Sequence, residues 1–156
     1  MIGFTIYGEP IPCHRPRFAF RGKYPHAYDD QKKIKEQYKW QIREAYREEP
    51  MDIPLYMDIT FFMPIPKGTS HKKIEAMLNG SILPEKRPDL DNCTKLILDC
   101  MNDLVYTDDA RICELHCKKV YSLKPCTVVK ILPALSTEIL SKDRVGKEVD
   151  ENDYRF

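Results

Sequence analysis

Residues 87–112 read "RPDLDNCTKLILDCMNDLVYTDDARI". From residue 91 to about residue 101 the apolar residues recur at the spacing of a helix that packs one face against a core. The same stretch holds six aspartates: Asp89, Asp91, Asp99, Asp103, Asp108 and Asp109. A core gains nothing from carboxylates collected at the end of a helix, so these acids form a solvated surface, a helix cap or a metal site.

The segment Asp89-Leu90-Asp91 precedes or opens this helix. Pro88 favours an extended residue before it, and we expect the extended geometry to continue through Asp91. In that geometry the two aspartates project to one side while Leu90 points to the core. Two neighbouring carboxylates repel each other unless a cation lies between them. Oxygen ligands of this kind select Mg²⁺, with Mn²⁺ as a substitute.

Further polar residues follow along the helix and beyond it. Asp91, Lys95 and Asp99 form one stripe at steps of four residues, and Asn92 lies at the same edge. Lys95 is therefore close enough to neutralise Asp91 or to reach a phosphate.

Asp108 and Asp109 lie at the entry to an expected strand, where adjacent side chains point to opposite faces. Only one of them can then join Asp89 and Asp91. Taken singly, each acid also has a structural explanation, because Asp91 could cap the helix, Asp89 could solvate a turn, and "TDDA" could be an exposed turn.

The rest of the 156-residue chain has the pattern of one α+β domain. Strands are expected at 2–8, 55–63, 112–122 and 125–133, a hairpin arm at 17–28, and helices after Asp29 or Asp30 and after Thr69 or Ser70. The first of these helices carries an apolar stripe, and the second is expected to turn its apolar residues inward. These apolar residues are Ile34, Tyr38, Ile42 and Ala45 or Tyr46 in the first helix, and Ile74, Met77 and Leu78 in the second. Tyr38, Trp40 and Tyr46 are expected to pack in the core rather than stack on bases.

The charges are distributed unevenly although the net charge is only +1. Residues 11–47 contain ten Lys or Arg against four acids, and the centre and tail carry the balancing acids. A basic arm of this kind suits contact with phosphates. Its candidate DNA-binding residues are Arg15, Arg17, Arg21 and Lys23, to which Arg87 is added beside the aspartates.

Six cysteines form no CxxC pair, and Cys113 and Cys117 lie about 13 Å apart if "RICELHCKKVYS" is a strand. We therefore expect small buried side chains in a reducing compartment rather than a zinc site. No apolar run reaches the length of a membrane helix, and the N-terminus lacks the pattern of a signal peptide. These features predict a cytoplasmic protein. Residues 134–156 are expected to be an acidic tail, mobile or packed on a partner subunit, after a domain at 1–133.

The motif residues closely resemble those of the RusA-type Holliday-junction resolvases. The shared pattern is a basic residue, then D-hydrophobic-D-N-x-x-K, a helix and a D-D pair, and the arm "GEPIPCHRPRFAFRGKYPHAY" resembles the basic arm of these proteins. The resemblance covers about residues 2–132. The chain departs from the family pattern through the insertion 67–86 and the tail, which leaves substrate preference open.

The resemblance implies a small mixed β-sheet packed against helices, in a two-fold dimer. It implies a magnesium-dependent endonuclease that cuts four-way DNA junctions by paired nicks, leaving 5′-phosphate and 3′-hydroxyl ends. Its metal ligands would be Asp89, Asp91 and Asp109, and its functional lysine Lys95, with Asn92, Asp99 and Asp108 as weaker candidates. Two alternatives remain: a nuclease with the same chemistry on flaps or forks, and a silent DNA-binding or phage structural homologue.

Overall fold

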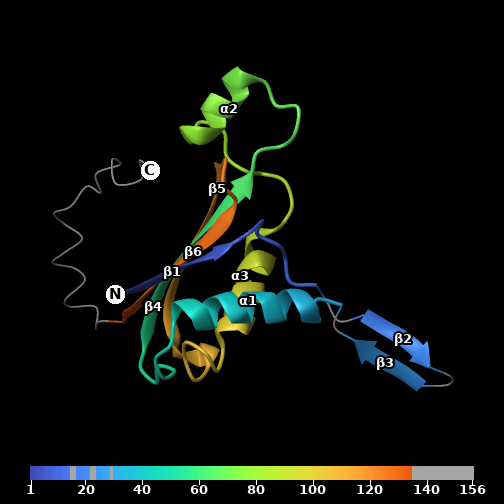
Figure 1. The fold of residues 1–156 in the computed structure, drawn as a ribbon, viewed down its shortest axis with the longest axis vertical. Helices are drawn as coiled ribbons and strands as arrows, with labels where there is room; N and C mark the ends of the chain where they lie inside the picture. Colours follow the sequence, from blue (N-terminus) through green and yellow to red (C-terminus); the bar gives the residue numbers. More distant parts are fainter. Residues whose placement is uncertain (15–16, 22–23, 29, 135–156) are drawn as a thin grey trace.

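The computed structural model describes residues 1–14, 17–21, 24–28 and 30–134, and for residues 17–21 and 24–28 it describes the backbone alone. Its main element is a four-stranded sheet of order β1-β6-β4-β5 (Figure 1). Strands β1, β6 and β4 pair antiparallel, whereas β4 and β5 pair in parallel. The strands are β1 (Ile2–Tyr7), β4 (Leu55–Pro64), β5 (Ile112–Ser122) and β6 (Cys126–Pro133). The sheet is therefore mixed, and the expected α+β fold is confirmed.

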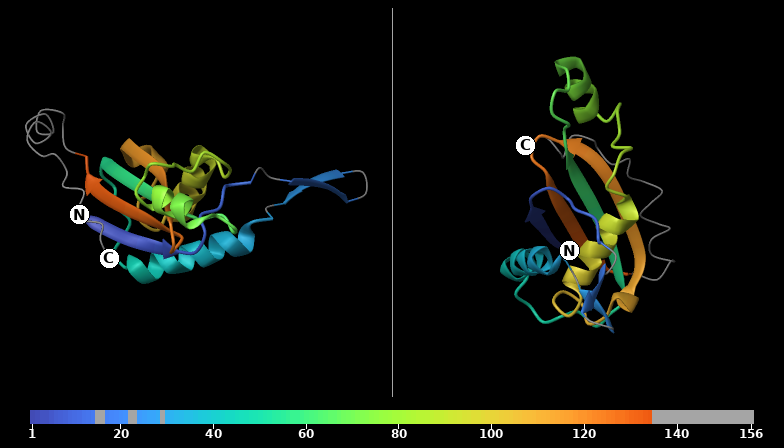
Figure 2. Two further views of the ribbon diagram at one scale, coloured as in Figure 1. Left: turned by 90° about the horizontal axis from the view of Figure 1, so that it is seen from above. Right: turned by 90° about the vertical axis from the view of Figure 1, so that its right-hand side faces the viewer.

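The core lies between one face of this sheet and two helices, α1 (Lys32–Ala45) and α3 (Leu90–Met101). Alternate residues of β4 are buried, which is the two-residue period of a strand with one face on a core. The helices contribute stripes that include Tyr38 and Ile42 from α1 and Leu96 and Ile97 from α3. Both helices cover the same face (Figure 2), and the expected apolar stripe of α1 is confirmed for Tyr38, Ile42 and Tyr46.

Trp40 is 63% exposed, so the expectation that it packs in the core is wrong. It lies two residues from both Tyr38 and Ile42, and two helical steps of 100° place it on the opposite side of α1.

The hairpin β2 (Arg17–Arg21) and β3 (Tyr24–Tyr28) forms the expected arm. It extends away from the sheet and helices in Figure 1 and in the left view of Figure 2. Arg15 and Lys23, and the side chains of Arg17 and Arg21, lie outside the described residues. So does the segment 135–156, and the expectations for the tail stay predictions.

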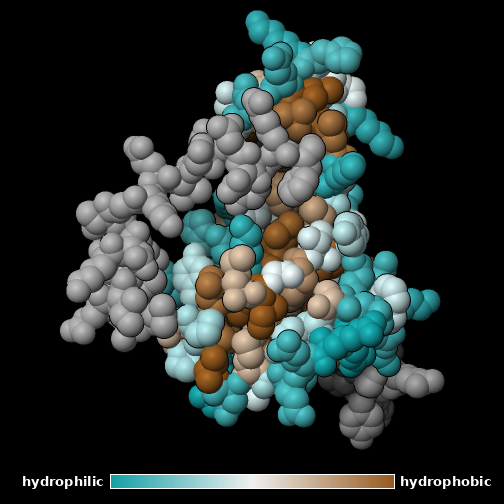
Figure 3. All heavy atoms as spheres, turned by 60° about the vertical axis from the view of Figure 1, so that its left-hand side comes forward, coloured by the Kyte–Doolittle hydropathy of each residue, from teal (hydrophilic) through white to brown (hydrophobic). Residues whose placement is uncertain are grey.

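The helix α2 (His71–Leu78) contains no buried residue, and Leu78 is 46% exposed. The expectation that Ile74, Met77 and Leu78 point inward is therefore wrong for Leu78, while Ile74 and Met77 are half-buried. The reason is position, because α2 stands beyond the ends of β4 and β5 (Figure 1), where the described residues form no second layer over it. Figure 3 shows an apolar patch at the top of the molecule. Leu78 of α2 and Ile82 and Leu83, which follow it in the sequence, are exposed.

All six cysteines are free thiols, and only Cys93 and Cys100 are fully buried. Cys113 is exposed, so the expectation of small buried side chains is wrong for that residue. Within the described ranges, no helix is long and apolar enough to cross a membrane.

The residue before α1 is Gln31, and not Asp29 or Asp30 as the sequence suggested. Gln31 is only 2% exposed and does not cap the helix with its side chain. Its Oε1 instead accepts a hydrogen bond from the His14 N–H at 2.6 Å, and its Nε2 donates to the Pro12 carbonyl at 2.8 Å. The buried amide therefore holds the segment that leads into the arm.

We expect Gln31→Met to lower the free energy of unfolding by about 1–3 kcal/mol, because it removes the two hydrogen bonds that the buried Gln31 amide makes to the backbone of Pro12 and His14. Urea unfolding measures this change. Gln37→Met is the control, since Gln37 is an exposed residue of the same helix. Equal stability of the two variants would contradict the bracing role of Gln31.

Candidate active site

The helix α3 begins at Leu90, with Asp89 as its extended N-cap residue (φ −72°, ψ 140°) and Asp91 in its first turn. The expected extended run through Asp91 is therefore wrong, because the helix starts one residue earlier. Leu90 does pack against the core, as expected. Both aspartates are exposed, and the dipole of the helix N-terminus favours negative charge at this place.

The carboxylate of Asp89 accepts no capping hydrogen bond. The interpretation of these acids as helix caps thus finds no support, since Asp91 lies inside the helix and Asp89 does not cap with its side chain. Both carboxylates stay available to a ligand from solution.

The stripe of Asp91, Lys95 and Asp99 lies exposed along α3, as the spacing predicted. Asp99 lies 4.0 Å from the Nζ of Lys35, which gives it an ion-pair partner on α1. Eight residues of helix separate Asp91 from Asp99 by about 12 Å along the axis. Asp99 is therefore remote from the N-terminal pair.

Asp108 and Asp109 do not enter β5 directly, because a short 3₁₀ turn, Asp109–Arg111, comes first. The Oδ1 of Asp108 accepts a hydrogen bond from the Ala110 N–H at 2.8 Å. The carboxylate of Asp108 thus caps this turn. The carboxylate of Asp109 takes no part in the cap.

Two buried side chains show how the acids are grouped. Burial raises the pKa of the Cys93 thiol to about 11, and the charges of Asp89 and Asp91 act in the same direction. Burial also raises the pKa of Tyr106, helped by the charges of three acids near it: Asp109, Asp99 and Asp108.

Asp89 and Asp91 therefore lie together at one end of α3, and the other three acids lie around Tyr106, whose hydroxyl donates to the Leu98 carbonyl. Among the described residues, no three Asp, Glu, His or Cys side chains converge on a point where they could share one ion.

A surface hollow joins the first of these groups to the start of the arm. From the arm side it is lined by Pro12, Cys13 and His14. From the aspartate side it is lined by Arg87, Pro88, Asp89 and Asn92. The Cys13 N–H donates to the Asn92 carbonyl at 2.8 Å, which fixes the arm's root on the first turn of α3. Arg87, Asp89 and Asn92, all selected from the sequence, are thus brought to one place.

Residues 7–132 match the sequence profile of the family described as endodeoxyribonuclease RusA. The chain belongs to the RusA endodeoxyribonuclease family. It is also 37% identical over 134 residues to "Uncharacterized protein YqaN" of Bacillus subtilis (strain 168). The aligned region covers 83% of this chain and 94% of that protein. The resemblance seen in the motif is confirmed, and the RusA match includes both the arm and α3.

The donor chemistry of the N-terminal pair in this RusA-family chain fits magnesium. Mg²⁺ is commonly held by one or two carboxylates and completes its shell with water and substrate phosphate. Asp89 and Asp91 supply two exposed carboxylates, and within the described part of the chain neither makes a hydrogen bond or ion pair through its side chain.

Sequence reasoning missed two residues at this candidate site. His14 lines the hollow, and its Nδ1 lies 3.3 Å from the Oδ1 of Asp30. Lys119 of β5 donates to the carbonyls of Lys86 and Pro88, directly before Asp89. The strand pattern did not single out Lys119. Lys118 and Lys119 are adjacent in "HCKKVY", so only one of the two can face the core, and the lysines alone do not show which.

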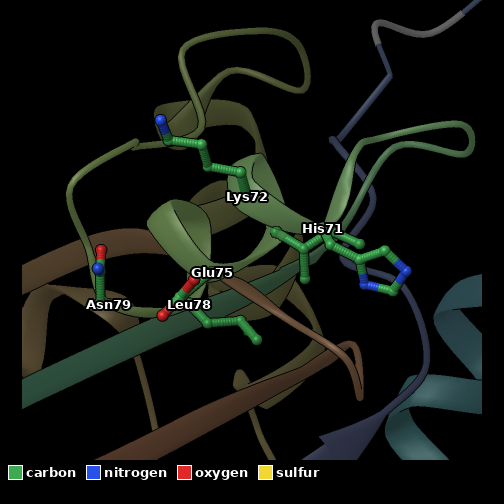
Figure 4. A pocket seen from close by; sticks show the side chains of 6 residues that line it. His71, Lys72, Glu75, Leu78 and Asn79 are labelled. Atoms are coloured by element: carbon green, nitrogen blue, oxygen red, sulfur yellow. The ribbon is translucent and has the colours of Figure 1, made fainter.

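A second hollow lies against α2 and includes His71, Lys72, Glu75 and Leu78. Figure 4 shows His71 and Lys72 pointing in different directions, so their polar groups do not converge on a ligand. None of the candidate catalytic, metal-binding or DNA-binding residues predicted from the sequence is among the residues that line it. The hollow at Asp89, which contains three of the candidate site residues, is therefore the candidate active site.

Proposed function

We propose that this protein is a magnesium-dependent, structure-specific endodeoxyribonuclease that resolves four-way DNA junctions by paired, symmetric nicks. Family membership supports DNA hydrolysis. The observation that carries the proposal is the shared hollow, in which Asp89 and Asn92 lie beside Arg87 and the root of the basic arm. A phosphate held by the basic groups there would lie next to the carboxylates.

In the proposed reaction, water attacks the phosphorus of one phosphodiester and the bond to the 3′ oxygen breaks. The products are a 5′-phosphate and a 3′-hydroxyl, which takes up a proton. Asp89 and Asp91 would hold Mg²⁺, which when bound supplies Lewis-acid stabilisation of the charge on the attacked phosphate. Arg87 would hold a neighbouring phosphate oxygen, and Lys95 would offset negative charge as it develops.

Asp109 is retained in the proposal as the third acid, because Asp108 caps its turn and Asp99 pairs with Lys35. A two-fold dimer would present two equivalent sites to a junction that itself has two-fold symmetry. This symmetry is the physical reason for expecting paired nicks.

The test is cleavage of end-labelled four-way junctions, flaps, forks and linear duplex, with Mg²⁺, Mn²⁺ or EDTA. The proposal expects symmetric cuts in the junction with either metal and none with EDTA. Preferred cleavage of flaps or forks would establish the alternative substrate, and binding without cleavage would establish a silent homologue. Asp109→Asn belongs in the same assay, and full activity would remove it from the site.

Arg15 and Arg17 are expected to contribute to affinity more than to the chemical step. Flanking prolines at 12 and 16 keep this part of the chain out of a helix. Arg15→Ala with Arg17→Ala should reduce the salt dependence of junction binding by about two phosphate contacts. Binding measured from low to high salt gives the slope. An unchanged slope would mean that the two arginines serve structure or dimerisation instead.

A further inference from the structure

Lys119 occupies an unusual place for a lysine, on the face of the sheet that packs against the core. It pairs with Phe61 of β4, which is 1% exposed. Cys117 and Tyr121, two residues away on either side along β5, pack against the core. Lys118 pairs with Thr60 and points to the opposite face. An ammonium in the position of Lys119 needs hydrogen-bond acceptors, since burying it unpaired is costly.

The acceptors lie in the segment that leads to the aspartates. The Nζ of Lys119 donates to the Lys86 carbonyl at 3.1 Å and to the Pro88 carbonyl at 2.9 Å. In the described part of the chain, these are the only hydrogen bonds to the backbone of residues 83–88. The segment connects α2 to α3 and is otherwise exposed, apart from a buried Pro84 and a half-buried Pro88.

Asp89 is therefore fixed on both sides. On one side its carbonyl accepts the Cys93 N–H at 3.1 Å, which is the first hydrogen bond of α3. On the other side the preceding residue, Pro88, is held by Lys119. Arg87 lies in the sequence between the two residues whose carbonyls Lys119 binds. Lys119 therefore also holds the backbone of Arg87, a residue that lines the hollow.

We propose that Lys119 is a positioning residue of the nuclease site, which tethers residues 86–88 to β5 and so fixes Asp89 and Arg87 for metal and phosphate. The kinetic part of this inference rests on the proposed function. The tether itself is a property of the folded chain and is measured without DNA or metal.

The first measurement is backbone motion by ¹⁵N NMR relaxation of the full-length protein. Lys119→Met keeps the apolar stem of the side chain but removes the charge and the donors. We expect the amide order parameters of Lys86, Arg87 and Asp89 to fall from the rigid range of about 0.85 towards the flexible range below about 0.6. Lys118→Met, the neighbour on the opposite face, should leave them unchanged.

The second measurement is junction cleavage under multiple turnover with Mg²⁺. A loosened Asp89 should lower kcat by about 10- to 100-fold, because small displacements of catalytic groups have effects of that size. KM should rise by a smaller factor than kcat falls, since Arg87 is loosened but the phosphate contacts expected of the arm are untouched. Lys118→Met should cut at the wild-type rate.

Lys119→Arg keeps the charge and several N–H donors, and it should retain order in residues 86–89 and most of the rate. Lys119→Arg is also the variant to measure if Lys119→Met does not fold. Wild-type order parameters in Lys119→Met would overturn the tether, as would a loss of order spread over the whole sheet. Loss of order with an unchanged kcat would overturn the positioning role. If the wild-type protein cuts no branched DNA, the proposed nuclease function fails, while the NMR result still decides the tether.

Discussion

Asp89→Asn and Asp91→Asn are each expected to lower the rate of junction cleavage by at least about 10³-fold. A metal ion contributes several kcal/mol of transition-state stabilisation, and each 1.4 kcal/mol corresponds to a factor of ten in rate. Asparagine keeps the shape of aspartate but removes the charge that holds the ion. Single-turnover cleavage with saturating protein measures the change directly.

Junction binding without metal should remain or become tighter in both variants. Removing one carboxylate lowers the repulsion between this end of α3 and the phosphates of DNA. Calorimetric titration with Mn²⁺ in the absence of DNA should show weaker metal binding. This measurement separates loss of the ion from loss of the substrate.

Asp103→Asn is a matched control from the same stretch. Asp103 is exposed and adopts a positive φ of 61°, a conformation that asparagine tolerates well. It should cut normally. The site variants should keep the wild-type stability within about 0.5 kcal/mol, because the Asp89 side chain makes no capping bond. Near wild-type cleavage by either site variant with Mg²⁺ would mean that these carboxylates are not ligands.

The fold was largely predictable because its strands and main helices carry strong periodic patterns. The alternation in β4 and the four-residue spacing of α1 and α3 come from residues that pack on one core. The pattern fails for α2, whose apolar residues have helical spacing although none of them is buried in the part of the chain that the structure describes. Periodicity shows which face is apolar, and only the path of the chain decides whether anything covers it.

The candidate site was predictable where its residues are close in sequence. Asp89, Asp91 and Asn92 share one end of α3 because a single helix start contains them. Gln31 and Lys119 act on segments 17 to 33 residues away, through hydrogen bonds to backbone carbonyl and amide groups. Backbone acceptors carry no signal of their own in the sequence, so such braces were not visible.

The position of Asp109 depends on the irregular segment between α3 and β5. Tyr106 forms isolated bridges with Met51 and Asn102, and these contacts steer the chain before the 3₁₀ turn. The sequence predicted a direct entry into the strand and could not give this path. The role of Asp109 therefore stays a prediction, whereas the place of Asp89 and Asp91 follows from the helix.

Lys95→Ala is expected to lower the single-turnover cleavage rate by about 10²-fold while the melting temperature stays the same. A charge that stabilises the transition state contributes an effect of that size. An i,i+4 pair on an exposed helix contributes only about 0.5 kcal/mol. The two roles therefore differ clearly in what the substitution does to rate.

The contacts in the structure favour the catalytic role. Lys95 is exposed between Asp91 and Asp99, yet Asp99 has its ion pair with Lys35 of α1. Among the described residues Lys95 makes no ion pair or hydrogen bond through its side chain, in contrast to Lys119, whose ammonium is engaged by two carbonyls. Of these two lysines, Lys95 is the one whose charge is available to a phosphate.

Lys95→Arg distinguishes the roles further. Arginine keeps the charge but replaces a compact ammonium with a planar fork, so it should restore little activity at a tight site and most of it on an open surface. Lys72→Ala is the control, since Lys72 is an exposed lysine on α2. Near-normal cleavage by both Lys95 variants would exclude a catalytic role, and the charge opposite the Asp89–Asp91 pair would then have to come from Arg87 or the arm.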